Sequence, residues 1–130
     1  MQVIYTSYFY RVLVSPATCP TESTLAIQIA VWDEFIAGSI ISQDDTICYN
    51  TPPNTIIANV ATGAGYLYDY EWQKKTNITG QWTQITSTNS LSYSSSPPLT
   101  ITTWFRIRYI SIHGCGDRYS DSIKVTVLPP

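Results

Sequence analysis

The sequence predicts an all-β protein with the architecture of a β-sandwich, and three observations support this. Short segments that alternate apolar and polar residues recur along the 130-residue chain, each bounded by turn residues, as is typical of half-buried strands. The chain holds 10 Tyr and 4 Trp with many Thr, Ile and Val, and these residue types favour strands. No window of helical length shows an apolar period of 3.6 residues.

Nine strands are expected. They lie at residues 8–15, 24–31, 38–42, 55–61, 66–74, 81–86, 90–94, 103–112 and 122–128. Seven strands after residue 31 with no helix between them indicate a sandwich. Pro97 and Pro98 lack backbone donors, so their segment is expected to be a loop. Turns are expected at residues 77–80 and at the Gly-Ala-Gly of 63–65, where positive φ is needed.

The apolar faces of these strands define an expected core. Tyr68, Tyr70 and Trp72 alternate with polar residues and therefore share one face of their strand. A central strand that presents a Trp to the second sheet is usual in sandwiches. The core is expected to contain Tyr70, Trp72, Trp82, Phe105, Ile107, Tyr109 and Val125. Trp104 and Arg106 fall on the opposite face of their strand, where an Arg can stack on a Trp.

The beginning of the chain matches a segment near its end, which indicates an internal repeat. Arg11 corresponds to Arg106, each preceded by aromatic residues, and Cys19 corresponds to Cys115 after one inserted residue. The strand that follows keeps its apolar phase in both places. We interpret residues 1–30 as the C-terminal strand pair of a preceding repeat and residues 31–130 as one complete repeat. A single nine-stranded domain with two similar hairpins is the alternative.

The three cysteines fit this repeat. A Cys48–Cys115 disulfide is predicted inside the complete repeat. Cys19 is then unpaired, because the counterpart of Cys48 would lie upstream of Met1. The bond would contribute roughly 3–4 kcal/mol by restricting the unfolded chain. In a simple sandwich topology the two positions lie at opposite ends, so the bond requires Cys48 to lie away from the turn between the first two strands. Three reduced, buried thiols are the alternative.

Several blocks of sequence carry a family resemblance. They are ICYNTPP at 47–53, YLYDYEW at 66–72, TTWFR at 102–106 and CGDRYSDSIKV at 115–125. Together they resemble the repeats of giant surface adhesins of Bacteroidetes, such as SprB-like gliding-motility adhesins. The resemblance covers residues 37–128, and residues 7–31 match the end of the preceding module. Asn50 stands where those repeats have Gly, and Ile107 separates two Arg that are adjacent in them.

The resemblance implies immunoglobulin-like antiparallel β-sandwich modules arranged in tandem. It implies a non-enzymatic structural module of a cell-surface adhesin filament or stalk, which supports adhesion or gliding and is exported by type IX secretion. The expected location is extracellular, at the cell surface. The expected partners are neighbouring repeats of the same chain or filament, and surface polysaccharide.

No catalytic site, metal site or cofactor is expected. His113 is the single histidine, and a hydrolytic triad would need it beside Ser or Cys with an orienting acid. We interpret it as a surface turn residue beside a structural cysteine. A zinc site would need about four ligands, and no C-x-x-C spacing exists. The acids of residues 43–45, with Asp117 and Asp121, lack the spacing of an EF-hand calcium loop.

Charge and hydropathy argue against two classes of partner. The net charge is -2 and only 12% of residues are charged, whereas nucleic-acid binding needs clustered Lys and Arg. No apolar run approaches the ~20 residues of a membrane helix. The first residues also lack the pattern of a signal peptide.

Trp32, Phe35 and Ile36 are expected to pack at the junction between modules and to stiffen it. Thr46 and Ser122 are candidate O-glycosylation acceptors, because Asp-Thr-Ile and Asp-Ser-Ile resemble the Asp-[Ser/Thr]-apolar acceptor of Bacteroidetes. Asn77 begins an N-x-T acceptor, which matters only in a host with the transferase.

Two other functions stay open at the level of sequence. The module could bind carbohydrate or protein through its loops. Alternatively, residues 1–30 could leave unpaired strand edges that exchange with another chain, which would make the protein a fibre subunit.

Overall fold

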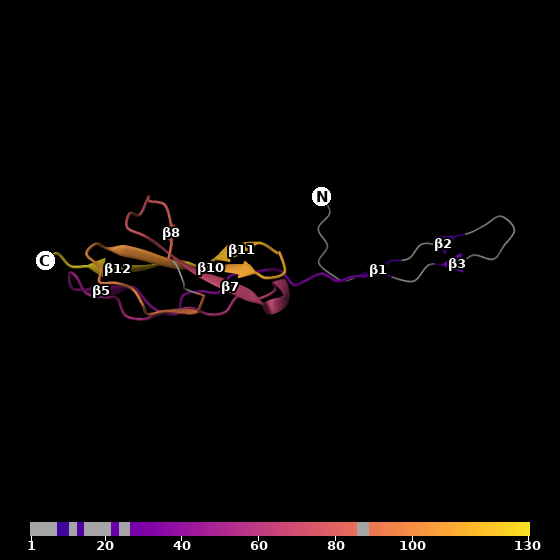
Figure 1. Cartoon of the computed structure of the whole chain (residues 1–130), viewed down its shortest axis with the longest axis horizontal. Coiled ribbons are helices and arrows are strands. Elements are labelled where there is room, and N and C mark those ends of the chain that lie inside the picture. The colour runs from indigo at the N-terminus through magenta and orange to yellow at the C-terminus, as the bar shows by residue number, and fades with distance from the viewer. Residues whose placement is uncertain (1–7, 11–12, 15–21, 24–26, 86–88) are drawn as a thin grey trace. The chain divides into compact units, whose positions relative to one another are not determined.

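The structure is a computed structural model that describes residues 8–10, 13–14, 22–23, 27–85 and 89–130. The chain divides into two compact units, Met1–Glu34 and Phe35–Pro130. The described residues form mostly strands with one short 3-10 helix, as Figure 1 shows. The predicted all-β class is confirmed.

The first unit contains two short antiparallel ladders. In one, β1 (Tyr8–Tyr10) pairs with β4 (Ile27–Ile29). In the other, β2 (Leu13–Val14) pairs with β3 (Glu22–Ser23). Strand pairing is therefore present where the sequence predicts a strand pair. Arg11 and Cys19 lie outside the described residues, and the interpretation of this unit as the end of a preceding repeat stays a prediction.

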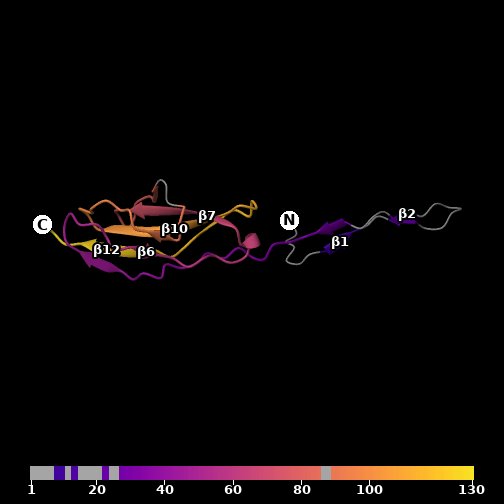
Figure 2. The same ribbon diagram turned by 60° about the horizontal axis from the view of Figure 1, so that its bottom comes forward.

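The second unit is built on a six-stranded sheet with the order β5-β12-β10-β7-β8, in which β11 also pairs with β10. Its strands are β5 (Asp45–Ile47), β7 (Tyr68–Lys75), β8 (Thr83–Gln84), β10 (Thr103–Ser111), β11 (Asp117–Tyr119) and β12 (Ile123–Val127). The long strands β7 and β10 pair over eight residues and run side by side (Figure 2). All pairs are antiparallel except β5–β12, which is parallel.

A smaller sheet covers the apolar face of this large sheet. It consists of β6 (Ile56–Ile57) and β9 (Ser92–Tyr93), which pair antiparallel. Isolated bridges join Ile40 to Ala58 and Thr51 to Leu99. The 3-10 helix η1 (Ala64–Tyr66) leads into β7.

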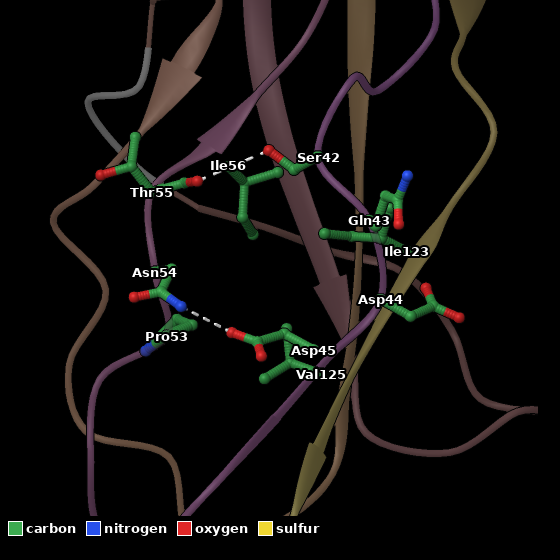
Figure 3. A pocket seen from close by; sticks show the side chains of 10 residues that line it. All are labelled: Ser42, Gln43, Asp44, Asp45, Pro53, Asn54, Thr55, Ile56, Ile123 and Val125. Atoms are coloured by element: carbon green, nitrogen blue, oxygen red, sulfur yellow. Dashed lines mark hydrogen bonds between the residues drawn. The ribbon is translucent and has the colours of Figure 1, made fainter.

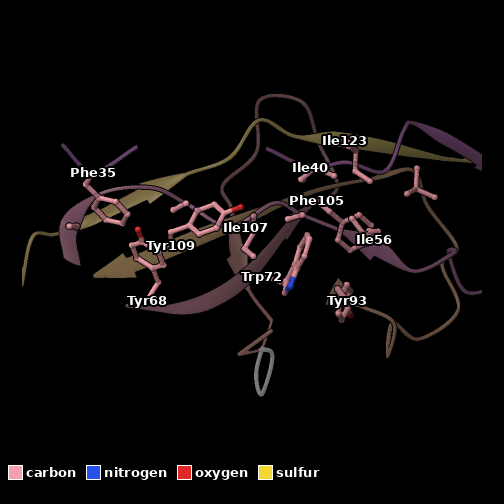
Figure 4. Packing of buried hydrophobic residues seen from close by; sticks show 14 of the residues in the cluster. Phe35, Ile40, Ile56, Tyr68, Trp72, Tyr93, Phe105, Ile107, Tyr109 and Ile123 are labelled. Atoms are coloured by element: carbon pink, nitrogen blue, oxygen red, sulfur yellow. The ribbon is translucent and has the colours of Figure 1, made fainter. Parts of the chain in front are cut away.

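The core lies between the two sheets (Figure 4). Along β10 buried residues alternate strictly with half-buried ones, as the period of a strand with one face in the core requires. Trp72 is fully buried and stacks on Tyr93 from the smaller sheet, with ring centroids 6.0 Å apart. The predicted core is confirmed for Trp72, Phe105, Ile107, Tyr109 and Val125, and Tyr70 packs against it partly buried.

The prediction was wrong for Trp82. This residue is half-buried and lies outside the core cluster, on the other face of the sheet. Its segment forms only the two-residue strand β8, paired at the end of β7. Residues three apart on an extended segment point to opposite faces, and of these two residues only Ile85 packs against the core.

Two expected turns are confirmed. The Asn77–Gly80 turn closes with a bond from the Gly80 amide to the Asn77 carbonyl, 2.9 Å. Gly63 and Gly65 have φ of 79° and 83°, which only glycine adopts at little cost. A Cβ at Gly65 would also lie 2.4 Å from the His113 ring, so a side chain there would displace that ring.

Candidate functional site

The face of β10 that points away from the core carries a connected group of charged, amide and aromatic side chains. We call it the outer face, and it comprises Trp82 from the β8 hairpin, Gln73 from β7, Arg106 and Arg108 from β10, and Tyr119 from β11. The alternation of β10 places its two arginines there because Phe105, Ile107 and Tyr109 occupy the core face.

Arg106 is held between two aromatic rings. Its guanidinium carbon lies 4.4 Å from the ring centroid of Trp82 and 4.0 Å from that of Tyr119. Its Nε also donates to Gln73 Oε1 at 2.8 Å. Burial lowers the pKa of Arg106 from its ordinary value, but an arginine stays charged at neutral pH. Lys75 lies over the same Trp82 ring at 4.7 Å.

Arg108 forms the ionic part of the outer face. It donates to Asp117 Oδ2 at 2.7 Å through Nε and to Glu71 Oε2 at 3.2 Å through one terminal nitrogen. The hydrogen bond to Asp117 raises the pKa of Arg108, and the same bond lowers the pKa of Asp117. Gln73 connects this pair to Arg106, because its amide nitrogen donates to the other oxygen of Glu71 at 3.1 Å.

The outer face is therefore a closed network of charges, amides and rings. Each arginine already has its partners within the protein, and the Trp82 ring already carries two cations. A platform that stacks sugar rings needs uncovered aromatic faces. The arrangement favours a role for these aromatic residues in stabilising the sheet.

A shallow pocket of about 260 Å³ opens between β5, β6 and β12 (Figure 3). Both carboxylates of the pocket accept hydrogen bonds from other groups of the protein. Asp45 Oδ2 accepts from the Asn54 amide at 2.8 Å, and Asp44 Oδ1 accepts from the Lys124 backbone amide at 2.7 Å. The first bond joins β5 to the segment before β6, and the second joins the residue before β5 to β12.

The acidic residues considered for calcium do not converge. Asp44 and Asp45 line the pocket, Asp117 pairs with Arg108, and Asp121 Oδ1 accepts from the Ile40 amide at 3.0 Å. In the part of the chain that the structure describes, no three His, Cys, Asp or Glu residues are placed to hold a metal ion.

The predicted Cys48–Cys115 disulfide is absent, and both thiols are free and exposed. Cys48 follows β5 at the end of the sheet where β10 begins, because Ile47 pairs with Val127 and Thr103 with Val125. Cys115 follows the other end of β10. A nine-residue strand spans about 30 Å, and a disulfide requires Cα atoms within about 7 Å. The two cysteines cannot pair within one unit.

The residues expected at the junction have different surroundings. Phe35 is 6% exposed and stacks on Tyr68 with ring centroids 5.5 Å apart, so it is a core residue of its own unit. Trp32 and Ile36 are 52% and 54% exposed. Ile36 exchanges backbone hydrogen bonds with Thr62, at 3.0 and 2.9 Å. A junction role stays a prediction for Trp32 and Ile36.

The remaining candidates are surface residues. Thr46, Ser122 and Asn77 are exposed, as an acceptor of a glycan must be. His113 is exposed in the loop after β10 and packs against Gly65. Their exposure fits the sequence interpretation of each without testing it.

The chain enters the second unit at one end of its large sheet and leaves it at the other. At the end we call N-terminal, Arg118 Nε donates to the Phe35 carbonyl at 3.1 Å, and η1 lies beside the loop after β10. At the other end, which we call C-terminal, the Leu128 amide donates to the Ile47 carbonyl at 2.9 Å. Sequence reasoning did not place these ends, because they depend on the parallel pairing of β5 and β12.

A family model described as Domain of unknown function (DUF8696) matches residues 37–129, and the chain belongs to that family. No curated protein matches the sequence. Within the described residues, no helix has the length and apolar character needed to cross a membrane.

Proposed function

We propose that this member of the DUF8696 family is a structural repeat module of a cell-surface adhesin filament or stalk. It is non-enzymatic, acts outside the cell, and supports adhesion or gliding by extending a chain of like modules. Export by the type IX system and contact with surface polysaccharide belong to the same proposal, which draws on the sequence resemblance to Bacteroidetes adhesins.

The observation that carries this proposal is the position of the chain ends. Phe35 lies beside Arg118 at one end of the large sheet, and Leu128 lies beside Ile47 at the other. Modules joined through such ends lengthen the chain with every copy, instead of folding back on the module before. This is the geometry that a stalk requires, because each module then contacts only its neighbours.

The strand order supports an immunoglobulin-like sandwich as the repeating unit. The large sheet runs β5-β12-β10-β7-β8, and β5 is parallel to its neighbour β12. The strands β6 and β9 form the opposite layer. A Trp on the central strand β7 packs across the core onto the second sheet, which is a feature of such sandwiches.

A structural role is also supported by how the polar side chains are used. The arginines of the outer face are bound to rings and carboxylates of the protein. The acids of the pocket bind backbone and amide groups. Side chains committed to internal bonds stabilise the module and leave few groups to act on a substrate.

Small-angle scattering tests the proposal on the full chain with one, two or three further copies of residues 31–130 appended. Each copy is expected to add roughly 30 Å or more to the maximum dimension, since β10 alone spans about that length. A maximum dimension that stays nearly constant as copies are added would contradict the stalk.

Trp32→Ala tests whether the junction is stiff. In the chain with added copies, the variant is expected to broaden the distribution of dimensions, because the ring no longer restricts the joint. Ile78→Ala is the matched control, since Ile78 is 70% exposed in the turn of residues 77–80 and lies outside the linker of residues 31–34. An unchanged distribution of dimensions for Trp32→Ala would show that Trp32 does not restrict the junction.

A further inference from the structure

Cys48 occupies an ordered turn at the C-terminal end of the unit. The Thr51 hydroxyl donates to the Cys48 carbonyl at 2.6 Å, and the Asn50 amide donates to the Leu99 carbonyl at 2.8 Å. Its neighbour Ile47 accepts from the amide of Leu128, where the chain leaves the unit. The exposed thiol is therefore held close to the point at which a following module would begin.

Cys115 occupies the opposite end, in an open loop. Gly114 and Gly116 flank it with φ of 77° and 90°, and a Cβ placed on Gly114 would meet nothing within 4 Å. Two residues before it, His113 packs on Gly65, and three residues after it Arg118 binds the Phe35 carbonyl. This exposed thiol lies beside the point at which the chain enters the unit.

A tandem arrangement brings these two ends together. The sequence repeat sets Ala30 at the position of Leu128, so four residues, 31–34, separate the last strand of one module from Phe35 of the next. Five residue steps span at most about 17 Å. The C-terminal end of each module, with its Cys48, is therefore held close to the N-terminal end of the next, with its Cys115.

Apolar side chains are exposed at both ends. Tyr49, Ile101 and Leu128 are 44%, 54% and 47% exposed at the C-terminal end. At the N-terminal end, Tyr66, Leu67 and Ile112 are 61%, 55% and 58% exposed. Surfaces of this kind are suited to contact between successive modules.

We propose that Cys48 of one module forms a disulfide with Cys115 of the module that follows it, so that the array is linked covalently across each junction. The partner is thus a second copy of the same unit. This inference rests on the proposed function, since it requires modules in series. It also accounts for both cysteines being free in a single unit.

The bond forms by exchange with an external disulfide, such as glutathione disulfide. The two cysteine thiols give up two protons and two electrons and form one S–S bond. The glutathione disulfide accepts them and becomes two glutathione thiols. The short linker favours this pairing, because it makes the encounter of the two thiols intramolecular.

The test uses the full chain with one further copy of residues 31–130 appended, incubated with glutathione disulfide. Peptide mapping is expected to show a link between Cys48 of the first copy and Cys115 of the second, with a mass decrease of about 2 Da and two fewer free thiols. The original chain, treated in the same way, is expected to keep its Cys48 and Cys115 peptides unlinked to one another.

Position-matched variants sharpen the test. Cys48→Ser in the first copy is expected to abolish the link, whereas Cys48→Ser in the second copy leaves it intact, because no module follows. Cys115→Ser gives the reverse pattern. A tandem chain that unfolds cooperatively and scatters as an extended array, but keeps these thiols free or links others, overturns the inference alone. A tandem chain whose copies do not form an extended array contradicts the proposed function itself.

Discussion

The two faces of β10 are stabilised by different kinds of contact. On the inner face Phe105, Ile107 and Tyr109 are at most 1% exposed and belong to the core. On the outer face Arg106 and Arg108 are half-buried and are fixed by rings and carboxylates. One face is stabilised by removal of apolar surface from water, and the other by directed contacts between charges and rings.

This comparison shows which contacts determine the free energy of unfolding and which determine the arrangement of the edge segments. Burial of a large aromatic side chain contributes several kcal/mol, whereas an exposed cation–ring contact or ion pair contributes about 1 kcal/mol or less. The inner face therefore decides whether the unit folds. The outer face decides how the edge segments β8 and β11 lie on the central strands.

Replacement of Trp72 by Ala is expected to have the largest effect. Trp72 is fully buried, and its indole nitrogen donates to the Ser90 carbonyl at 2.9 Å. The free energy of unfolding should fall by about 3–5 kcal/mol, from lost burial and the cavity left behind. Urea unfolding followed by fluorescence or circular dichroism measures it.

Trp104→Ala is the matched control, because Trp104 lies on the same face of β10 as Arg106. Trp104 is half-buried and lies under Lys124, whose nitrogen is 5.7 Å from the ring centroid. A loss of about 1 kcal/mol is expected. Equal losses of unfolding free energy for the two variants would contradict the difference between the two faces.

Tyr109→Phe tests a polar contact made from the inner face. The hydroxyl donates to the Asn59 carbonyl, so the variant should lose about 1–2 kcal/mol of unfolding free energy at neutral pH. Burial raises the pKa of Tyr109 to about 12 from 10.0. Because the unfolded chain then ionises first, this group loses its stabilisation as the pH rises from 10 to 12.

The measurement for Tyr109→Phe is the difference in unfolding free energy between the two proteins as a function of pH. The difference should shrink between pH 10 and 12, since only the original protein has this hydroxyl to ionise. A constant difference across that range would show that the hydroxyl titrates alike in the folded and unfolded chain.

Arg106→Ala is expected to cost about 1–2 kcal/mol of unfolding free energy, because two ring contacts and the bond to Gln73 disappear. Its main effect should be local: faster amide hydrogen exchange in β8 and β11, which it connects to β10. Arg106→Lys is the control, since it keeps the charge but not the planar group that lies between two rings. Unchanged exchange rates in Arg106→Ala would show that Arg106 does not hold β8 and β11 in place.

Asp117→Asn is expected to have the smallest effect, at most about 1 kcal/mol, because the pair with Arg108 is partly exposed. The bond to Arg108 lowers the pKa of Asp117 below 3.8. Its stabilisation is therefore present above pH 3.8 and is lost as the pH falls through the lowered pKa. Thermal unfolding between pH 2 and 7 should show the two proteins converging at the acid end.

The sequence predicts the inner face better than the outer one. Residues 103–112 and 122–128 were expected as strands, and β10 and β12 occupy Thr103–Ser111 and Ile123–Val127. Strict alternation of apolar residues made this possible, because it reports which face is buried. Trp82 shows the limit, since its place depends on the distant Arg106 and not on its neighbours in sequence.

The edge strands and the cysteines show a second limit. Residues 38–42 were expected as a strand, yet only Ile40 forms a bridge there, and β5 begins at Asp45. The polar sequence of β5 carries no strand signal, and its pairing is with β12 at the far end of the chain. The same long-range pairing decides which end Cys48 occupies, so sequence spacing alone could not show that Cys115 is out of reach.

The parallel pairing of β5 with β12 has a consequence for a module under tension. A force that pulls the two chain ends apart draws β5 toward the N-terminal end and β12 toward the C-terminal end. The register pairs Val125–Asp45, Thr126–Thr46 and Val127–Ile47 must then slide past one another, so their hydrogen bonds resist the force together. Strands that peel apart would instead break such bonds one at a time. The edge of the sheet therefore resists a force applied along the line between the points where the chain enters and leaves this unit.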